Sequence, residues 1–545
     1  MIYKVSLPFV FLYLLGFSHF ARAQDLYEVS SIQEIRIYFA EDNWDEILDE
    51  LYTKGERERL LGNVTINGTE YKDVGIRYKG YSSASTDRVK NPFNIDLEYT
   101  YEDQNHQGFD KLKLSNVIHD PSFIREVLSY DIAQKYMPAS MANFANVYVN
   151  DELIGLYTNV ESVDKNFLRK HFGSKHNAFI KCNPERVNLN GENSNLANAH
   201  GTNPFSYEAY YTLKSNDSSH WNNLYHLIDT LNNYPEYLDS VLNIDQTLWM
   251  HALNYTLINF DSYIGYAQNY YLYQADDGRF QPILWDMNQS FASYRLTDAS
   301  NYWQGFSVSE APKLDPLTHY ESVSVLPRPL LRNIFENSTY RKMFLAHIRT
   351  IVEDIFSSDY YKSRATYFQS LIDNDVSKDP NKFYGYNLFA QNIDTTVNFL
   401  IDYPGIFSLM DARVEYLLDY KGVLGAPTIN NVFAKTSDHS AGSELVITAE
   451  ILNTKNVKLA YRIGQSGAFK YIDMYDDGNN DDNEASDNLY GIEIQNVGNY
   501  IDYYVLAEND SAGAFMPRRA ANEFYTHHTI AMPGDIVINE LMAKN

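Results

Sequence analysis

Three polar residues around one predicted hairpin have the side-chain types that phosphoryl transfer requires. Asp261 lies in a polar loop, Asn269 directly precedes an apolar run, and Asp286 directly follows a second apolar run, with the turn signal Asp277-Gly278 between the runs. In such a site one carboxylate accepts the hydroxyl proton, while an amide oxygen and a second carboxylate hold magnesium. The sequence therefore predicts a phosphoryl-transfer site, and an ordinary β-hairpin with polar ends is the alternative.

Basic residues earlier in the chain are candidates for phosphate contacts. Arg77 and Lys79 alternate along one predicted strand, so their side chains face the same side, and Lys90 precedes the next predicted strand. Each of the three has a simpler interpretation as half of a surface ion pair.

The elements that must position these residues fall into two regions. Residues 30–160 alternate short apolar runs with turn signals such as Asn67-Gly68, which predicts a mostly antiparallel sheet, and Asp120-Pro121 predicts a helix over 122–136. Residues 220–420 carry mainly helical periodicity. The expected fold class is α+β, with a strand-rich first lobe and a helical second lobe.

The chain changes character after residue 424. Short alternating runs separated by turn signals predict a small all-β sandwich of immunoglobulin-like type over residues 425–532. Within it, the acidic segment 476–487 is rich in oxygen ligands but lacks EF-hand spacing, so both a calcium site and a solvated acidic loop remain open. Residues 533–545 predict the beginning of another strand.

The first residues of the sequence indicate export. The rest of the sequence indicates a protein that is soluble or attached to a surface. Residues 1–23 combine Lys4, a short apolar run and Ala21-Arg22-Ala23, which predicts a cleaved signal peptide and a secreted or cell-surface protein. No later segment is apolar enough to predict a transmembrane helix. The net charge of −27 argues against nucleic acid as a partner. Cys182 is the single cysteine, and we expect its side chain to be buried and to pack like that of a small apolar residue.

Several motifs, taken in order, resemble the CotH (spore coat protein H) kinase family over roughly residues 30–420. They are Val74-Gly75-Ile76-Arg77-Tyr78-Lys79-Gly80-Tyr81-Ser82-Ser83, Lys90-Asn-Pro-Phe-Asn-Ile, Lys113-Leu-Ser-Asn116, Asp120-Pro121, Arg125-Glu126, Gly155-Leu-Tyr157, Glu161, Asn259-x-Asp261, Asn269-Tyr-Tyr-Leu-Tyr273, Trp285-Asp286-Met-Asn288 and Pro329-Leu-Leu331. Downstream, residues 427–530 resemble an immunoglobulin- or fibronectin-like domain, and the segment from Ile536 resembles the opening strand of a lamin-tail-like domain.

The resemblance implies a bilobal, atypical protein-kinase-like domain over residues 24–424 that uses ATP with Mg²⁺ or Mn²⁺. It implies that Asp261 is the catalytic base and that Asn269 and Asp286 are the metal ligands. Asn288 stands where the family often has a second acid. The nucleotide-binding residues that it implies are Arg77, Lys79, Lys90, Glu126 as the helix partner of a basic residue, and Glu161 near adenine.

Three functions follow from these patterns. The first is a secreted, metal-dependent kinase that transfers the γ-phosphoryl group of ATP to Ser or Thr hydroxyls of an exported protein. Because ATP is scarce outside the cell, the second is a catalytically silent kinase fold whose β-domain contacts a surface or a glycan. The third is a glycoside hydrolase, which needs two carboxylates about 5 to 9.5 Å apart, but Asn269 between the two acids favours metal binding.

Overall fold

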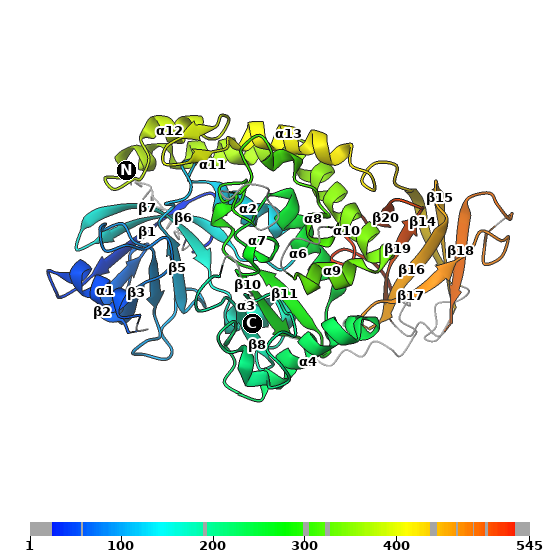
Figure 1. The fold of residues 1–545 in the computed structure, drawn as a ribbon, viewed down its shortest axis with the longest axis horizontal. Helices are drawn as coiled ribbons and strands as arrows, with labels where there is room; N and C mark the ends of the chain where they lie inside the picture. The colour runs from blue at the N-terminus through cyan, green and yellow to red at the C-terminus, as the bar shows by residue number, and fades with distance from the viewer. Residues whose placement is uncertain are drawn as a thin grey trace, which may run out of the picture.

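The computed structural model describes residues 24–55, 58–188, 193–297, 305–321, 327–436, 444–464, 467–482, 484–495 and 500–528. The predicted signal peptide, 1–23, and the predicted last strand, in 533–545, lie outside these described residues. Figure 1 shows a β-barrel, a helical region and a two-sheet β unit that follow one another along the long axis of the molecule. The chain is therefore a mixed α/β structure with three neighbouring regions.

The first region is a closed barrel, with strands in the order β1-β2-β3-β4-β5-β7-β6. The predicted antiparallel pairings are present, and the Asn67-Gly68 turn joins β2 to β3 with both residues at positive φ, as a two-residue hairpin requires. Closure comes from a parallel pair between β1 and β6, which the predicted sheet did not include. The strands are β1 (Ile32–Tyr38), β2 (Leu60–Ile66), β3 (Thr69–Tyr78), β4 (Phe93–Asp96), β5 (Lys111–Ser115), β6 (Ala142–Val149) and β7 (Glu152–Glu161).

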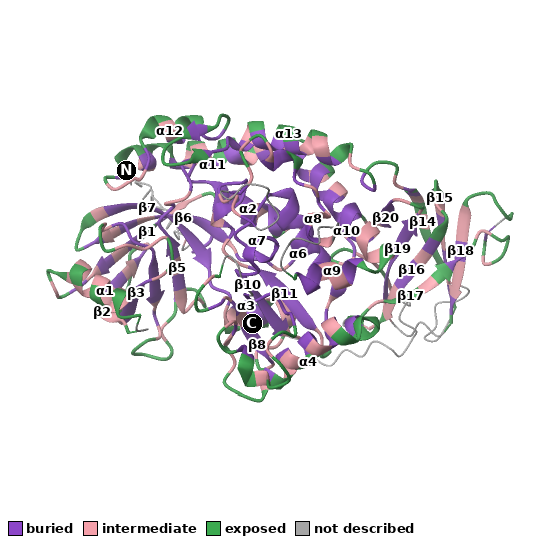
Figure 2. Cartoon of the chain, viewed as in Figure 1, coloured by how far each residue is buried: buried purple, intermediate pink, exposed green. Residues whose placement is uncertain are grey.

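The second region is mostly helical and surrounds a small sheet in the order β11-β10-β8-β9. Its strands are β8 (Phe179–Cys182), β9 (Thr212–Leu213), β10 (Tyr270–Gln274) and β11 (Phe280–Leu284), and a separate two-stranded pair is β12 (Val397–Asn398) with β13 (Asp402–Tyr403). Cys182 is buried, as predicted. The central helices and the inner strands are buried, whereas α1, α4 and α12 expose one face (Figure 2).

The helices of the described residues follow the predicted pattern in most places. They are α1 (Trp44–Thr53), α2 (Arg125–Ala133), α3 (Lys165–Phe172), α4 (His220–Asn233), α5 (Leu238–Val241), α6 (Ile244–Thr256), α7 (Tyr263–Tyr266), α8 (Thr318–Glu321), α9 (Pro329–Phe335), α10 (Ser338–Ile351), α11 (Tyr360–Lys378), α12 (Tyr386–Gln391) and α13 (Ile406–Leu418). None of the helices in the described part of the chain has the length and apolar character needed to cross a membrane.

Helix α2 is shorter than the predicted 122–136. The Asp120 carboxylate accepts hydrogen bonds from the backbone N–H groups of Ser122 and Arg125, and Phe123 has a φ of 62°. These contacts hold residues 121–124 in a turn, so the helix begins only at Arg125.

The third region consists of two antiparallel sheets, β14-β15-β18 and β17-β16-β19-β20, with β21 added to β19. Its strands are β14 (Thr428–Thr436), β15 (Leu445–Leu452), β16 (Asn456–Ile463), β17 (Lys470–Met474), β18 (Leu489–Ile494), β19 (Tyr500–Glu508), β20 (Gly513–Met516) and β21 (Tyr525–His528). Alternate side chains of both sheets form a separate apolar core. The immunoglobulin-like topology stays a prediction.

The two-sheet unit is packed directly onto the helical region. The indole N–H of Trp249 donates to the Ala520 carbonyl at 3.0 Å, and the His347 ring stacks between Trp249 and Phe515 with centroid distances of 3.7 and 5.1 Å. Phe515 and Ala520 belong to the same apolar cluster as the core of the helical region. The boundary predicted near residue 425 therefore lies between the helical region and the β unit in the sequence, but in the folded chain these two regions bury side chains against each other.

Candidate active site

The hairpin of β10 and β11 brings the predicted metal ligands to one end of the small sheet. Tyr270 pairs with Leu284, so Asn269, directly before β10, and Asp286, shortly after β11, both lie beyond this end of the ladder. Both residues have left-handed backbone conformations, with φ of 58° and 59°. Asn and Asp tolerate this conformation better than most residues, which is one reason that these types suit the two positions.

Asp261 lies in the loop after α6, and its carboxylate is buried and held from both sides. The side-chain amide of Gln268 donates to Oδ1 at 2.6 Å, and that of Gln289 donates to Oδ2 at 2.7 Å. Burial, and next the neighbouring Asp286, raise the pKa of Asp261 to about 7. A carboxylate with this pKa is suited to accept a proton near neutral pH.

Asn269 is fixed to the Asp261 loop through its own side chain. Its Nδ2 donates to the main-chain carbonyl of Asp261 at 2.9 Å, and its backbone N–H donates to Asn183 Oδ1 at 2.9 Å. Because the amide nitrogen is used in this way, Oδ1 is the atom that remains to bind a cation.

Asp286 is positioned through its backbone, which leaves its carboxylate available. The backbone N–H donates to the Tyr130 hydroxyl at 3.1 Å, which ties Asp286 to helix α2. Among the residues that the structure describes, none donates a hydrogen bond to the half-buried Asp286 carboxylate. Two residues further on, Asn288 Oδ1 is buried and has no hydrogen-bond donor within the described chain. These oxygens are the kind of donor set that a hard divalent cation fits.

A cluster of basic side chains faces these acids. It comprises Arg77 on β3, Lys79 directly after β3, Lys113 on β5 and Lys181 on β8. Burial and then the charges of Lys79 and Arg77 hold the pKa of Lys113 well below its ordinary value. Burial lowers the pKa of Lys181 to about 8, and the opposing effect of Asp286 shows that this carboxylate lies within electrostatic reach. The basic side chains near Asp286 are therefore suited to bind an anionic ligand.

Glu126 on helix α2 connects the basic cluster to Asp286. The Lys79 ammonium donates to Ser115 Oγ at 3.2 Å, and the buried Glu126 carboxyl group lies near both Lys79 and Ser115, with its Oε2 accepting no hydrogen bond from the described residues. Burial, followed by the charge of Asp286, raises the pKa of Glu126 to about 8, and Lys79 opposes that shift. The structure thus brings Lys79, Ser115 and Glu126 together.

Lys90, which was predicted to contact a phosphate, has a buried anionic partner of its own. Its side chain is 1% exposed, its ammonium forms a 2.6 Å ion pair with Asp379 Oδ2, and Asp379 also accepts the backbone N–H of Leu156. A buried ammonium with this partner joins the barrel to the C-terminal end of α11. We therefore leave Lys90 out of the proposed phosphate site.

Glu161 occupies the end of β7 with partners of its own. Its Oε2 accepts the backbone N–H of Met141 at 2.9 Å, and its Oε1 lies 3.5 Å from the Lys170 ammonium. Burial raises the pKa of Glu161, and Lys170 opposes that effect. An approach of Glu161 to adenine stays a prediction.

Four residues of the site were not among the predicted ones: Gln268, Gln289, Lys113 and Lys181. Gln268 and Gln289 stand next to Asn269 and Asn288 in the sequence, so their proximity to the motif is visible there. Lys113 belongs to one of the motifs quoted above, whereas Lys181 reaches the site only because β8 pairs with β10.

Comparison of the sequence with known proteins identifies its family. Residues 76–417, more than half of the chain, match the model of the CotH kinase protein family. The inner spore coat protein H of Bacillus subtilis (strain 168) is 23% identical over 340 residues, which cover 60% of this chain and 84% of that protein.

Proposed function

The chain belongs to the family of CotH kinase proteins, and on that premise we propose that it is a metal-dependent kinase. The reaction transfers the γ-phosphoryl group of ATP to a Ser or Thr hydroxyl of an exported or surface protein. The observation that carries the proposal is Asp286, whose carboxylate accepts no hydrogen bond from the described residues and lies within electrostatic reach of both the base candidate Asp261 and Lys181 of the basic cluster.

Each group has a distinct part in the proposed reaction. Asp261 accepts the proton of the acceptor hydroxyl, whose oxygen forms a bond to the γ-phosphorus, while the bond to the bridging oxygen breaks and ADP leaves with the electron pair. Gln268 and Gln289 hold the Asp261 carboxylate in place for this step. Lys79, Lys113 and Lys181 bind phosphate oxygens, Ser115 holds Lys79 through a hydrogen bond, and Glu126 lies close to Lys79.

Asp286 and the Asn269 Oδ1 atom would hold Mg²⁺ or Mn²⁺, which supplies charge neutralisation for the phosphates when it is bound. The donor set is two protein oxygens with Asn288 nearby, and Mg²⁺ commonly uses one or two carboxylates together with phosphates and water.

A surface location is part of the proposal. The relative named above is a spore coat protein, and an exported kinase of this kind would meet its acceptor outside the cytoplasm. The alternative is a catalytically silent member that binds a surface protein or glycan, and it is favoured by Asn288 at a position where a second acid is expected.

The first experiment is nucleotide binding by thermal shift on residues 24–545, with ATP and either MgCl₂ or MnCl₂. At a ligand concentration of 100 times Kd, binding adds about 2.7 kcal/mol to the free energy of unfolding. Asp286→Ala is expected to abolish this effect. Asp277→Ala, at the opposite end of the same hairpin, is the matched control and should keep it.

Transfer of labelled γ-phosphate, to the chain itself or to a surface-protein extract, then separates the two functions. Asp261→Ala should retain binding and lower the transfer rate by roughly 10²- to 10⁴-fold. Binding without transfer in the unmodified protein would support the silent alternative, and absence of metal-dependent binding would refute the kinase proposal.

A further inference from the structure

The loop between β17 and β18 gathers three carboxylates at the junction of the two sheets of the β unit. β17 belongs to the sheet that contains β19, and β18 belongs to the sheet of β14 and β15, so this loop crosses from one sheet to the other. Ligand atoms of Asp476, Asp482 and Asp487 all lie within 4.8 Å of one another. The three like charges repel one another, and the backbone N–H groups of Ser486, Asp487 and Asn488, which donate to Asp476, offset this repulsion only in part.

Asp482 gives an independent indication of a ligand. Its side chain is only 3% exposed, although Asp is rarely buried without a partner. Oδ2 accepts the backbone N–H of Gly478 at 2.5 Å, whereas Oδ1 has no hydrogen-bond donor in the described part of the chain. A buried carboxylate oxygen with no donor costs free energy that a bound cation would recover.

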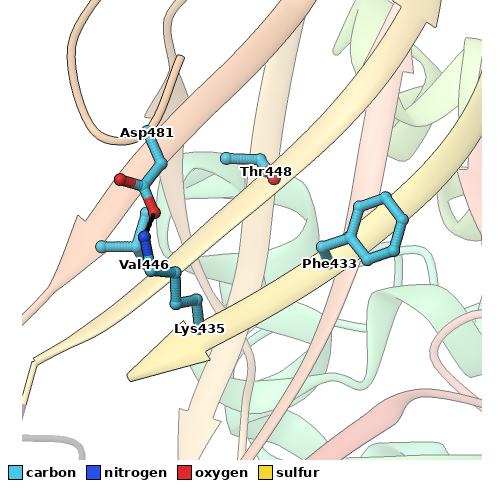
Figure 3. A pocket seen from close by; sticks show the side chains of 5 residues that line it. All are labelled: Phe433, Lys435, Val446, Thr448 and Asp481. Carbon is cyan, nitrogen blue, oxygen red and sulfur yellow. Dashed lines mark hydrogen bonds and ion pairs between the residues drawn. The ribbon is translucent and has the colours of Figure 1, made fainter. Parts of the chain in front are cut away.

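Basic side chains do not supply this compensation. Within the described residues, no Lys or Arg forms an ion pair with any of the three clustered acids. Asp481, the neighbour of Asp482, does have a cationic partner: its Oδ2 lies 2.6 Å from the Lys435 ammonium. Figure 3 shows this pair at the edge of a surface hollow that Phe433, Val446 and Thr448 also line. Asp481 is therefore a natural control for the cluster.

We propose that Asp476, Asp482 and Asp487 bind a divalent cation, with Ca²⁺ preferred. The donors are oxygen atoms only, which suits a hard cation and disfavours the metals that select His or Cys. Ca²⁺ accepts six to eight oxygen ligands in flexible geometry, so it suits an irregular loop that supplies carboxylates and admits water. A bound cation here would fasten the crossover between the two sheets, a role separate from the proposed kinase site.

The test uses residues 24–545 carrying Asp286→Ala, so that the proposed catalytic metal site does not contribute. Calorimetric titration with CaCl₂ after removal of trace metal is expected to show one site, with a Kd on the order of 10⁻⁴ to 10⁻³ M as in extracellular modules. Adding Asp482→Asn should weaken that affinity by about tenfold or more, and adding Asp481→Asn should leave it within about twofold.

Further measurements keep the outcome decisive. If Asp482→Asn prevents folding, as judged by circular dichroism, Asp487→Asn at an exposed position replaces it, and the same loss of affinity is expected. No calcium binding up to about 10 mM, well above the range of extracellular modules, or equal binding by the Asp481 and Asp482 variants, would overturn the proposal. Equal affinity for MgCl₂ would overturn the preference for calcium.

Discussion

The side-chain nitrogen of Asn269 donates a 2.9 Å hydrogen bond to the main-chain carbonyl of Asp261. This bond joins the loop of the proposed base to the hairpin that carries the proposed metal ligands. It therefore fixes two parts of the site relative to each other and leaves the side-chain oxygen of Asn269, Oδ1, to bind the cation.

Asn269→Ala removes both the hydrogen bond and the proposed ligand oxygen. We expect the affinity for ATP with Mn²⁺ to fall by roughly 10- to 100-fold, as is typical when a metal site loses a supporting group. Isothermal titration of the folded variant measures this effect. Asn177→Ala, which removes an exposed hydrogen bond to Asp276, is the control. Unchanged metal-nucleotide affinity in Asn269→Ala would show that the amide does not support the metal.

The buried acids predict a particular dependence of stability on pH. The pKa of Glu126 rises from 4.5 to about 8, and that of Asp261 rises from 3.8 to about 7, chiefly because both are buried. The unfolded chain therefore binds fewer of these protons than the folded chain between about pH 4 and pH 8. The two groups stabilise the fold fully below about pH 4, and this contribution is lost as pH rises toward 8.

Glu126→Gln tests the expected direction of the change in stability with pH. The amide cannot ionise, so the variant should gain stability over the unmodified chain at pH 8.5, on the order of 1 kcal/mol or more, and gain little at pH 4.5. Urea unfolding at the two pH values, without metal or nucleotide, measures the difference. Asp277→Asn, an exposed acid on the hairpin turn, should show no such pH-dependent gain. A larger gain at pH 4.5 than at pH 8.5 would contradict the assignment.

The sequence predicts the local parts of this structure well, because short-range signals determine them. The Asn67-Gly68 turn and the alternating runs around it specify the β2–β3 hairpin, and the residues around Asp277-Gly278 specify β10 and β11. Barrel closure depends on pairing between β1 and β6, which are far apart in the chain, and no local signal encodes that pairing.

The same limit applies to the candidate site. Asp261, Asn269 and Asp286 come from one continuous motif, so their shared location follows from the hairpin. The partner of Lys90, in contrast, is Asp379, which is 289 residues away. A basic residue before a strand is compatible with a phosphate contact, and only the tertiary structure distinguishes that role from a buried ion pair.

The Lys90–Asp379 pair predicts a large loss of stability when one charge is removed. Lys90→Met leaves the Asp379 carboxylate buried without its counter-charge, so unfolding free energy should fall by about 3–5 kcal/mol. Urea unfolding measures this change, and Lys378→Met, at an exposed neighbour of Asp379, should change stability by less than about 0.5 kcal/mol. The folded fraction of Lys90→Met should still bind nucleotide. If Lys90→Met lost nucleotide affinity but kept its stability, the result would show that Lys90 binds phosphate.

The contact between the helical region and the β unit predicts that residues 24–424 do not reach the stability of the longer chain. Removing residues 425–545 uncovers Trp249 and His347, which Ala520 and Phe515 contact, and it removes the 2.7 Å hydrogen bond from Arg349 to the Gly513 carbonyl. We expect residues 24–424 to bind a hydrophobic dye and to unfold at lower temperature than residues 24–545.

A point substitution tests the same interface in the full-length chain. Phe515→Ala should cost about 3–5 kcal/mol, because it removes a buried ring that stacks on His347. Phe433→Ala is the matched control, since that ring on β14 is 63% exposed and its loss should cost less than about 0.5 kcal/mol. Urea unfolding followed by circular dichroism measures both variants. Equal stability of the two variants, together with a fully stable 24–424 fragment, would show that the two regions fold independently and that the shared buried surface contributes little.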